Sequence, residues 1–280
     1  MAGAYLLSKL PVCRLFRFAH LYFADAGIAS RVGHLRFTFK DTRTPFILIQ
    51  ATRPSVIGSS DPSNLTYPIG AISVDPSARE ITGRNPERQD AIIQPISTPA
   101  TGFSGYFCAR FDTEFASWGT ANNGTLRDGQ REGDGGVLSA YVRFASRTTL
   151  TVNVRIGVSY ISVEQARRNL DLEIPEGTAL ENTASKTRAL WAEKLNRIQI
   201  QGATDDDLQV FYTAFFHTLH VGVTQCVAGM RSELVVQYPN EQSEEGRYYS
   251  GYDDSIHEGE SYTAYSIWAS QPPSFYAIFR

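Results

Sequence analysis

Cysteine is scarce in this sequence, and so is any excess of charge of one sign. Cys13, Cys108 and Cys226 form no Cys-x-x-Cys pair, which argues against a cysteine zinc site or a thioredoxin-like motif. Their odd number leaves at least one thiol unpaired, while one disulfide remains possible. The formal net charge of -3 provides no basic field for nucleic acid, so we expect no nucleic-acid partner.

Long apolar runs are also lacking. No stretch approaches the ~18 consecutive apolar residues of a membrane-spanning helix, so we expect no membrane partner. Basic and apolar residues alternate at the N-terminus rather than forming the separate regions of a signal peptide, and we expect residues 1–33 to be poorly defined. The sequons at Asn64 and Asn123 would permit glycosylation if the chain were secreted.

What the sequence does contain is a series of short apolar runs between residues 34 and 160. The clearest is 151–160, where apolar and polar residues alternate with a period of two, as in a strand with one buried face. Many short strands at this spacing predict a β-sandwich, which we assign to residues 1–161. We interpret 122–125 as a hairpin turn and 132–136 as a flexible connector. The other predicted strands lie near 37–39, 46–49, 69–74, 91–96, 106–111 and 137–144.

The periodicity changes to helical at Ser162. Ser162 and Gln165 have the form of a capping box, which predicts a helix through Leu170. A second helix is predicted over 186–198, and together they form a helical connector over 162–203.

A third helix is predicted from Leu208 to Leu219. Thr204 and Asp207 form a second N-cap pair, and apolar residues follow at helical spacing. We expect this helix to begin a further helical domain over 204–280.

The stretch from Tyr248 to Trp268 is the most informative. It combines aromatic residues, carboxylates and a histidine, and its glycines interrupt any regular period, which favours a loop. Aromatic faces pack against sugar C–H groups, and carboxylates accept hydrogen bonds from hydroxyl groups or bind a hard cation. Asp253, Asp254, His257 and Trp268 are the residues of this stretch whose side chains suit such contacts. The alternatives are that the aspartates form a turn, that His257 is solvated, and that Trp268 belongs to a core.

Four segments of the sequence, in this order, resemble glycoside hydrolase family 92, the calcium-dependent exo-acting α-mannosidases. In that family a Tyr-Ser-Gly-Tyr-Asp-Asp-x-x-His motif precedes Tyr-Ser-x-Trp-Asp. Here the first motif is complete at 249–257, whereas Trp268 is followed by Ala269 rather than aspartate. The four segments are 105–111, 154–169, 211–219 and 248–268.

The resemblance implies a galactose-mutarotase-like sandwich packed on an (α/α)6 barrel. It also favours Asp253, Asp254, His257 and Trp268 as substrate-binding residues. Members of the family remove terminal α-mannose with inversion, use calcium, and act on mannose-containing glycans. Their catalytic acid and base come from later barrel elements. We therefore expect a truncated chain without the catalytic residues, whose calcium ligands are also missing. The alternatives are a non-catalytic carbohydrate-binding fragment and a fragment without a stable function. The family suggests an extracellular or secretory location.

Overall fold

In the computed structural model most of the predicted sandwich can be described. The side chains of residues 16–28 and 217–221 are outside this description. The described residues are 16–18, 21–28, 31–52, 69–86, 102–221, 246–250 and 253–259. Among them, no helix is both long enough and apolar enough to cross a membrane.

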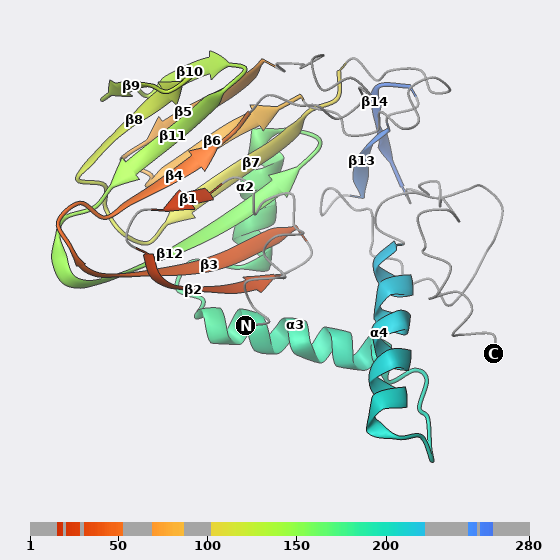
Figure 1. Ribbon diagram of the computed structural model, residues 1–280. Coiled ribbons are helices and arrows are strands. Elements are labelled where there is room, and N and C mark those ends of the chain that lie inside the picture. Colours follow the sequence, from red (N-terminus) through yellow and green to blue (C-terminus); the bar gives the residue numbers. More distant parts are fainter. Residues whose placement is uncertain are drawn as a thin grey trace, which may run out of the picture. The chain divides into compact units, whose positions relative to one another are not determined.

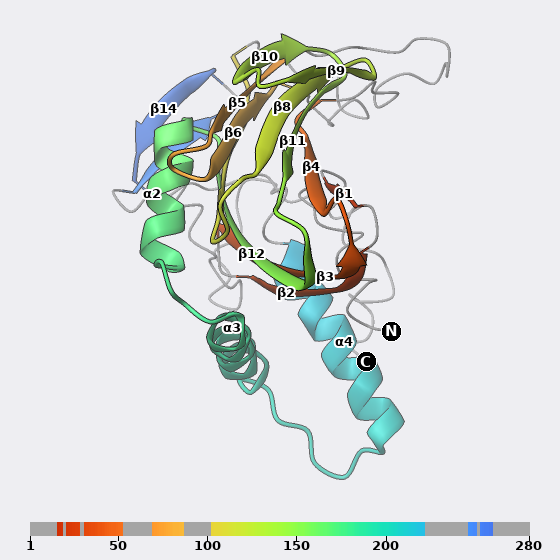
Figure 2. The same ribbon diagram turned by 90° about the vertical axis from the view of Figure 1, so that its left-hand side faces the viewer.

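Two antiparallel sheets form the sandwich, as Figures 1 and 2 show. One sheet has the strand order β10-β5-β6-β7-β12-β3-β2 and the other has the order β1-β4-β11-β8-β9. The strands of the first sheet are β2 (Leu21–Ile28), β3 (Val32–Thr42), β5 (Gly70–Asp75), β6 (Glu80–Asn85), β7 (Gly105–Phe111), β10 (Glu132–Gly135) and β12 (Arg147–Ser159). Those of the second are β1 (Phe16–Phe18), β4 (Phe46–Gln50), β8 (Ser117–Asn122), β9 (Thr125–Asp128) and β11 (Leu138–Arg143).

The core lies between the two sheets and confirms the period-two prediction. Val152, Val154 and Ile156 on β12 point into it and are almost fully buried. Ile49 on β4 and Val142 on β11 belong to the same cluster. Removing these apolar side chains from water is the main favourable contribution to folding of the sandwich.

The outer face of the larger sheet is covered by helix α2 (Val163–Glu173). Ala166 and Leu170 pack there against Cys108, whose burial raises the pKa of its thiol to about 12. Gly157 permits this close approach, because a Cβ atom at that position would lie 2.0 Å from the carbonyl oxygen of Ala166. The helix therefore forms a third layer on part of the sandwich.

The structure confirms the predicted hairpin turn at 122–125 but not the predicted connector at 132–136. Asn123 and Gly124 form the predicted hairpin turn between β8 and β9, with φ angles of 47° and 80°. The prediction of a connector at 132–136 is wrong, because Glu132–Gly135 forms β10 and pairs with β5. The predicted strand at 91–96 lies outside the described residues.

The first connector helix begins as predicted. The Ser162 hydroxyl accepts a hydrogen bond from the Gln165 backbone N–H at 3.0 Å, which satisfies one of the free donors at the helix start. The Gln165 side chain donates to Asn169 Oδ1 at 2.9 Å. Capping is thus confirmed on the serine side of the box.

Helix α3 (Leu180–Leu195) begins earlier than the predicted 186–198, because its first turn packs on the sandwich. Leu180 is buried, His34 Nδ1 lies 3.1 Å from Thr183 Oγ1, and Arg36 forms an ion pair with Glu181. These contacts involve residues distant in the sequence, so local periodicity gives no sign of them.

Helix α4 (Asp205–Val221) confirms the third predicted helix. The Thr204 hydroxyl and the Asp207 carboxylate cap its first turn reciprocally, with the Asp207 N–H donating to Thr204 Oγ1 at 3.2 Å. Phe215 is buried against apolar residues from both α4 and the end of α3, among them Trp191 and Leu195.

The chain divides into two compact units. One comprises 1–184 and 249–257, and the other comprises 185–248 and 258–280. The sandwich with α2 belongs to the first unit, and α4 belongs to the second. The mainly β fold that the sequence predicted is confirmed.

Candidate functional site

The described part of the motif forms a short hairpin rather than a loop throughout. Strands β13 (Arg247–Ser250) and β14 (Ser255–Glu258) make a two-stranded sheet. The expectation that no regular structure exists here is therefore wrong. Asp253 and Asp254 lie in the turn between the strands, and Asp254 has a φ of 58°, a left-handed conformation that aspartate tolerates better than most residues.

Asp254 connects this turn to the sandwich. Its Oδ2 atom accepts a hydrogen bond from the Gly102 N–H at 2.7 Å, and its Oδ1 atom accepts one from the Tyr249 hydroxyl at 2.6 Å. Next to Gly102, the ring of Phe103 lies 5.5 Å from that of Tyr160 and 6.0 Å from that of Tyr249, measured between centroids. The hairpin is thus held near the start of β7 and the end of β12.

Asp253 forms a second polar group with His257 and Ser255. Asp253 Oδ2 lies 2.6 Å from His257 Nε2, and Ser255 Oγ lies 2.9 Å from the same nitrogen. Because both contacts use one ring nitrogen, His257 cannot relay a proton between Ser255 and Asp253, as the histidine of a catalytic triad does with its two nitrogens.

The Asp253 carboxylate is ionised at neutral pH. Desolvation raises its pKa, but hydrogen bonds from Ser250, His257 and Ser255 together outweigh this effect and lower the pKa below its ordinary value. The side chains of Asp253 and His257 are 51% and 40% exposed, so a ligand in solution can reach both. This pair can therefore accept hydrogen bonds from hydroxyl groups and donate to them.

Of the four candidate residues, the structure brings three together in one hairpin, and Trp268 lies outside the described residues. Sequence reasoning missed the partners on the sandwich, Gly102, Phe103 and Tyr160. Gly102 contacts a residue 152 positions away in the sequence, and a short-range pattern cannot reveal such a pairing.

The described residues do not fit a calcium ion. No group of three or more histidine, cysteine, aspartate or glutamate side chains is arranged to hold a metal in the part of the chain that the structure describes. Calcium takes six to eight oxygen ligands. Asp253 and Asp254 are the two carboxylates of the turn, and both already accept hydrogen bonds from the protein.

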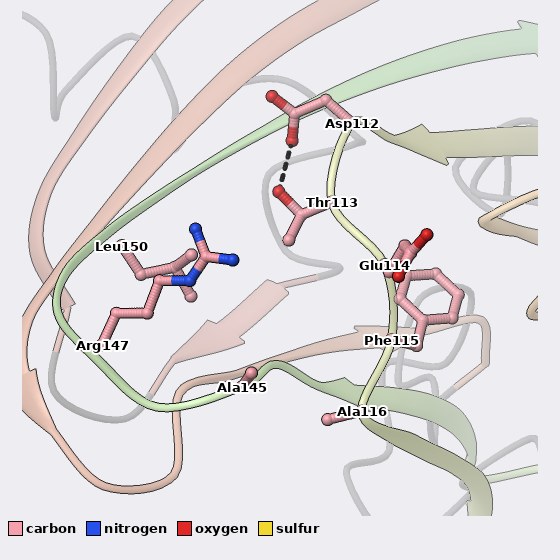
Figure 3. Close-up of a pocket in the computed structure, with 8 residues that line it drawn as sticks. All are labelled: Asp112, Thr113, Glu114, Phe115, Ala116, Ala145, Arg147 and Leu150. Atoms are coloured by element: carbon pink, nitrogen blue, oxygen red, sulfur yellow. Dashed lines mark hydrogen bonds between the residues drawn. The ribbon is translucent and has the colours of Figure 1, made fainter.

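A separate cleft of about 390 Å³ lies at the opposite ends of β7 and β12. Figure 3 shows Arg147 extending towards the backbone segment that carries Asp112 and Thr113. The Asp112 carboxylate accepts hydrogen bonds from the Thr113 hydroxyl and the Asn153 N–H, which fixes it locally. None of the candidate residues lines this cleft, whose lining comprises Asp112, Thr113, Glu114, Phe115, Ala116, Ala145, Arg147 and Leu150.

The sandwich and the hairpin both lie in segments that match domains of a known family. Residues 24–159 match the glycosyl hydrolase family 92 N-terminal domain, and residues 165–272 match the family 92 catalytic domain. The chain belongs to glycosyl hydrolase family 92. The family resemblance inferred from four segments of the sequence is thereby confirmed.

Solved structures of the family share the fold. A family 92 inverting mannosidase from Bacteroides thetaiotaomicron is 21% identical and has a TM-score of 0.65. The match covers 86% of this chain and 28% of the mannosidase. A family 92 α-mannosidase from the same organism, in complex with mannoimidazole, is 18% identical with a TM-score of 0.62. The match covers 91% of this chain and 30% of that mannosidase. A further family 92 glycosyl hydrolase is 19% identical with a TM-score of 0.63, and the match covers 88% of this chain and 28% of that protein.

The chain therefore spans less than a third of the length of these relatives. At such identities, the likeness to the solved structures establishes the fold. No curated protein matches the chain in sequence.

Proposed function

We propose that this chain provides the sandwich and first helical elements of an exo-acting, inverting α-mannosidase. Its substrate would be terminal α-mannose, α-1,2-linked, on N-glycans or mannans. The observation that carries the proposal is the consecutive match to both family 92 domains, together with a family motif whose turn is held against the sandwich. The structural relatives described as mannosidases support the same substrate class.

In this proposal the motif hairpin contributes to sugar binding. The ionised Asp253 carboxylate accepts hydrogen bonds from sugar hydroxyl groups, and His257 lies beside it. Trp268 is proposed as an apolar surface for the sugar ring. Asp254 lies in the same turn and holds it to the sandwich by accepting a hydrogen bond from the Gly102 N–H.

The catalytic acid and base are proposed to be other residues than these. An inverting glycosidase needs a carboxylic acid with a raised pKa and a carboxylate about 6.5–9.5 Å away that activates water. Asp253 has a lowered pKa, which suits an acceptor and not a general acid. We accordingly propose that the 280-residue chain binds mannosides but does not hydrolyse them. Calcium dependence and an extracellular or secretory location remain predictions from the family.

The test is mannose release from α-1,2-mannobiose, with calcium chloride and with EDTA, alongside calorimetric titration of the same disaccharide. We expect no release, but binding that discriminates against α-1,2-linked glucobiose. Asp253→Asn should weaken binding, whereas Glu114→Gln, in an exposed carboxylate of the separate cleft, should leave it unchanged.

Two outcomes would contradict the proposal in different ways. Mannose release that EDTA abolishes would place the catalytic pair within this chain, while supporting the mannosidase assignment. Neither release nor binding, from a preparation with the circular dichroism of a folded β-rich protein, would overturn the proposed substrate. Binding without discrimination between the two disaccharides would favour a general carbohydrate-binding role.

A further inference from the structure

The two adjacent aspartates of the motif are both exposed but have different hydrogen-bond partners. The Asp253 carboxylate contacts His257 within its own hairpin and is half-exposed. The Asp254 carboxylate instead reaches the Gly102 N–H, on a segment that leads into the core of the sandwich. Asp253 therefore makes a contact within its own hairpin, whereas its neighbour Asp254 contacts a residue far away in the sequence.

We propose that Asp254 is a positioning residue that fixes the motif hairpin on the sandwich, and that it is not itself a ligand of the glycan. This inference rests on the proposed function, because it assigns the glycan contacts of the turn to Asp253 and His257. We call the contact between Asp254, Gly102 and Tyr249 the clasp.

Features of both the sandwich and the hairpin favour the clasp. A Cβ atom at position 102 would lie 2.6 Å from Asp254 Oδ1 and 3.0 Å from Oδ2, so any other residue there would displace the carboxylate from its present position. On the hairpin side, the left-handed backbone at Asp254 directs a short side chain back towards Gly102. A hydrogen bond from a neutral N–H to a carboxylate is about twice as strong as one between neutral groups.

Aromatic packing supports the same contact. Tyr249 donates its hydroxyl proton to Asp254 and also packs its ring against Phe103, the residue that follows Gly102. Phe103 in turn packs on Tyr160, which follows β12 directly. The hairpin position is therefore coupled to two central strands of the larger sheet, β7 and β12.

The chemistry of the two roles differs in a way that substitution can separate. A carboxylate that binds the glycan depends on its negative charge for strong hydrogen bonds from sugar hydroxyl groups, whereas the clasp needs an acceptor for one N–H and a partner for one hydroxyl. Asparagine provides both, because its oxygen can accept from Gly102 while its amide donates to the Tyr249 oxygen. Asparagine also tolerates the left-handed conformation at this position. Glycine tolerates that conformation as well but lacks the side chain.

The experiment compares Asp254→Gly, Asp254→Asn and Gly102→Ala with the wild-type chain. Amide hydrogen exchange of residues 247–250 and 255–258 is measured first, and then binding of α-1,2-mannobiose with calcium present. Gly105→Ala is the matched control, because a Cβ atom there makes only ordinary contacts, at 3.8 Å and 4.0 Å.

We expect Asp254→Gly and Gly102→Ala to accelerate exchange of the hairpin amides about tenfold. A variant that carries both substitutions should exchange little faster than either single variant, because both remove the same contact. Both should weaken mannobiose binding, while Asp254→Asn and Gly105→Ala stay near wild type. Rescue by asparagine marks a positioning role, which a direct charge-dependent ligand would not show.

Each contrary result has its own meaning. Unchanged exchange in Asp254→Gly and Gly102→Ala would overturn the clasp. Loss of binding in Asp254→Asn with unchanged exchange would make Asp254 a direct ligand and also overturn it. If the wild-type chain binds no mannobiose but the exchange pattern is as expected, the clasp stands and the proposed glycan fails.

Discussion

Glu80 is a buried carboxylate between helix α2 and the larger sheet, and we predict that Glu80→Gln destabilises the chain. Its side chain is 5% exposed. One carboxylate oxygen accepts hydrogen bonds from Arg110 at 2.8 Å and 2.6 Å, and the other accepts one from Arg167 at 3.1 Å. Arg110 also contacts Asp171 on α2. Glutamine keeps the shape of the side chain but removes the charge that compensates two arginines.

The magnitude follows from what remains after the substitution. Removing one partner of a buried ion pair costs roughly 3–5 kcal/mol, because the other charge is left uncompensated. Arg110 is 16% exposed and Arg167 is 38% exposed, so water can partly solvate both guanidinium groups. We therefore expect the lower end of this range, a loss of about 3 kcal/mol in the free energy of unfolding.

Urea unfolding followed by the circular dichroism of the sheets measures this loss directly. Asp171→Asn is the matched control, because its side chain is 50% exposed and its ion pair with Arg110 should contribute less than about 1 kcal/mol. A loss below about 1 kcal/mol for Glu80→Gln would show that the desolvation cost of the carboxylate cancels its attraction to the arginines. In that case apolar packing alone would hold α2 on the sheet.

Two further predictions concern the connector. Ser162→Ala should lower the free energy of unfolding by about 1 kcal/mol, because it removes the acceptor for the Gln165 N–H. Ser162→Asn should retain most of this stability, because asparagine also caps helices well. Equal losses in both variants would contradict the cap. The pKa of His34 is lowered from 6.5, first by burial and then by nearby arginines, so the unfolded chain takes up a proton at a higher pH than the folded one. Stability should therefore fall as the pH drops below about 6.5, and His34→Gln should flatten this dependence between pH 7.5 and 5.5; an unchanged slope would refute the assignment.

The composition of the motif, together with its resemblance to family 92, directed attention to Asp253, Asp254 and His257. It could not separate the roles of the two aspartates. That difference depends on Gly102, whose N–H reaches Asp254 across 152 residues of sequence. Hydrogen bonds of this kind form only when the segments that carry the two residues are brought together by the fold.

The sequence alone determined the elements whose pattern is local. The alternation over 151–160 gave a strand with one buried face, and Ser162 and Thr204 marked helix starts, because periodicity and capping depend on residues a few positions apart. Only the tertiary structure decided that Glu132–Gly135 pairs with β5, since this segment has no apolar alternation and gains its order from backbone hydrogen bonds to a neighbouring strand. The same holds for the early start of α3 at Leu180, which follows from burial against the sandwich rather than from helix propensity.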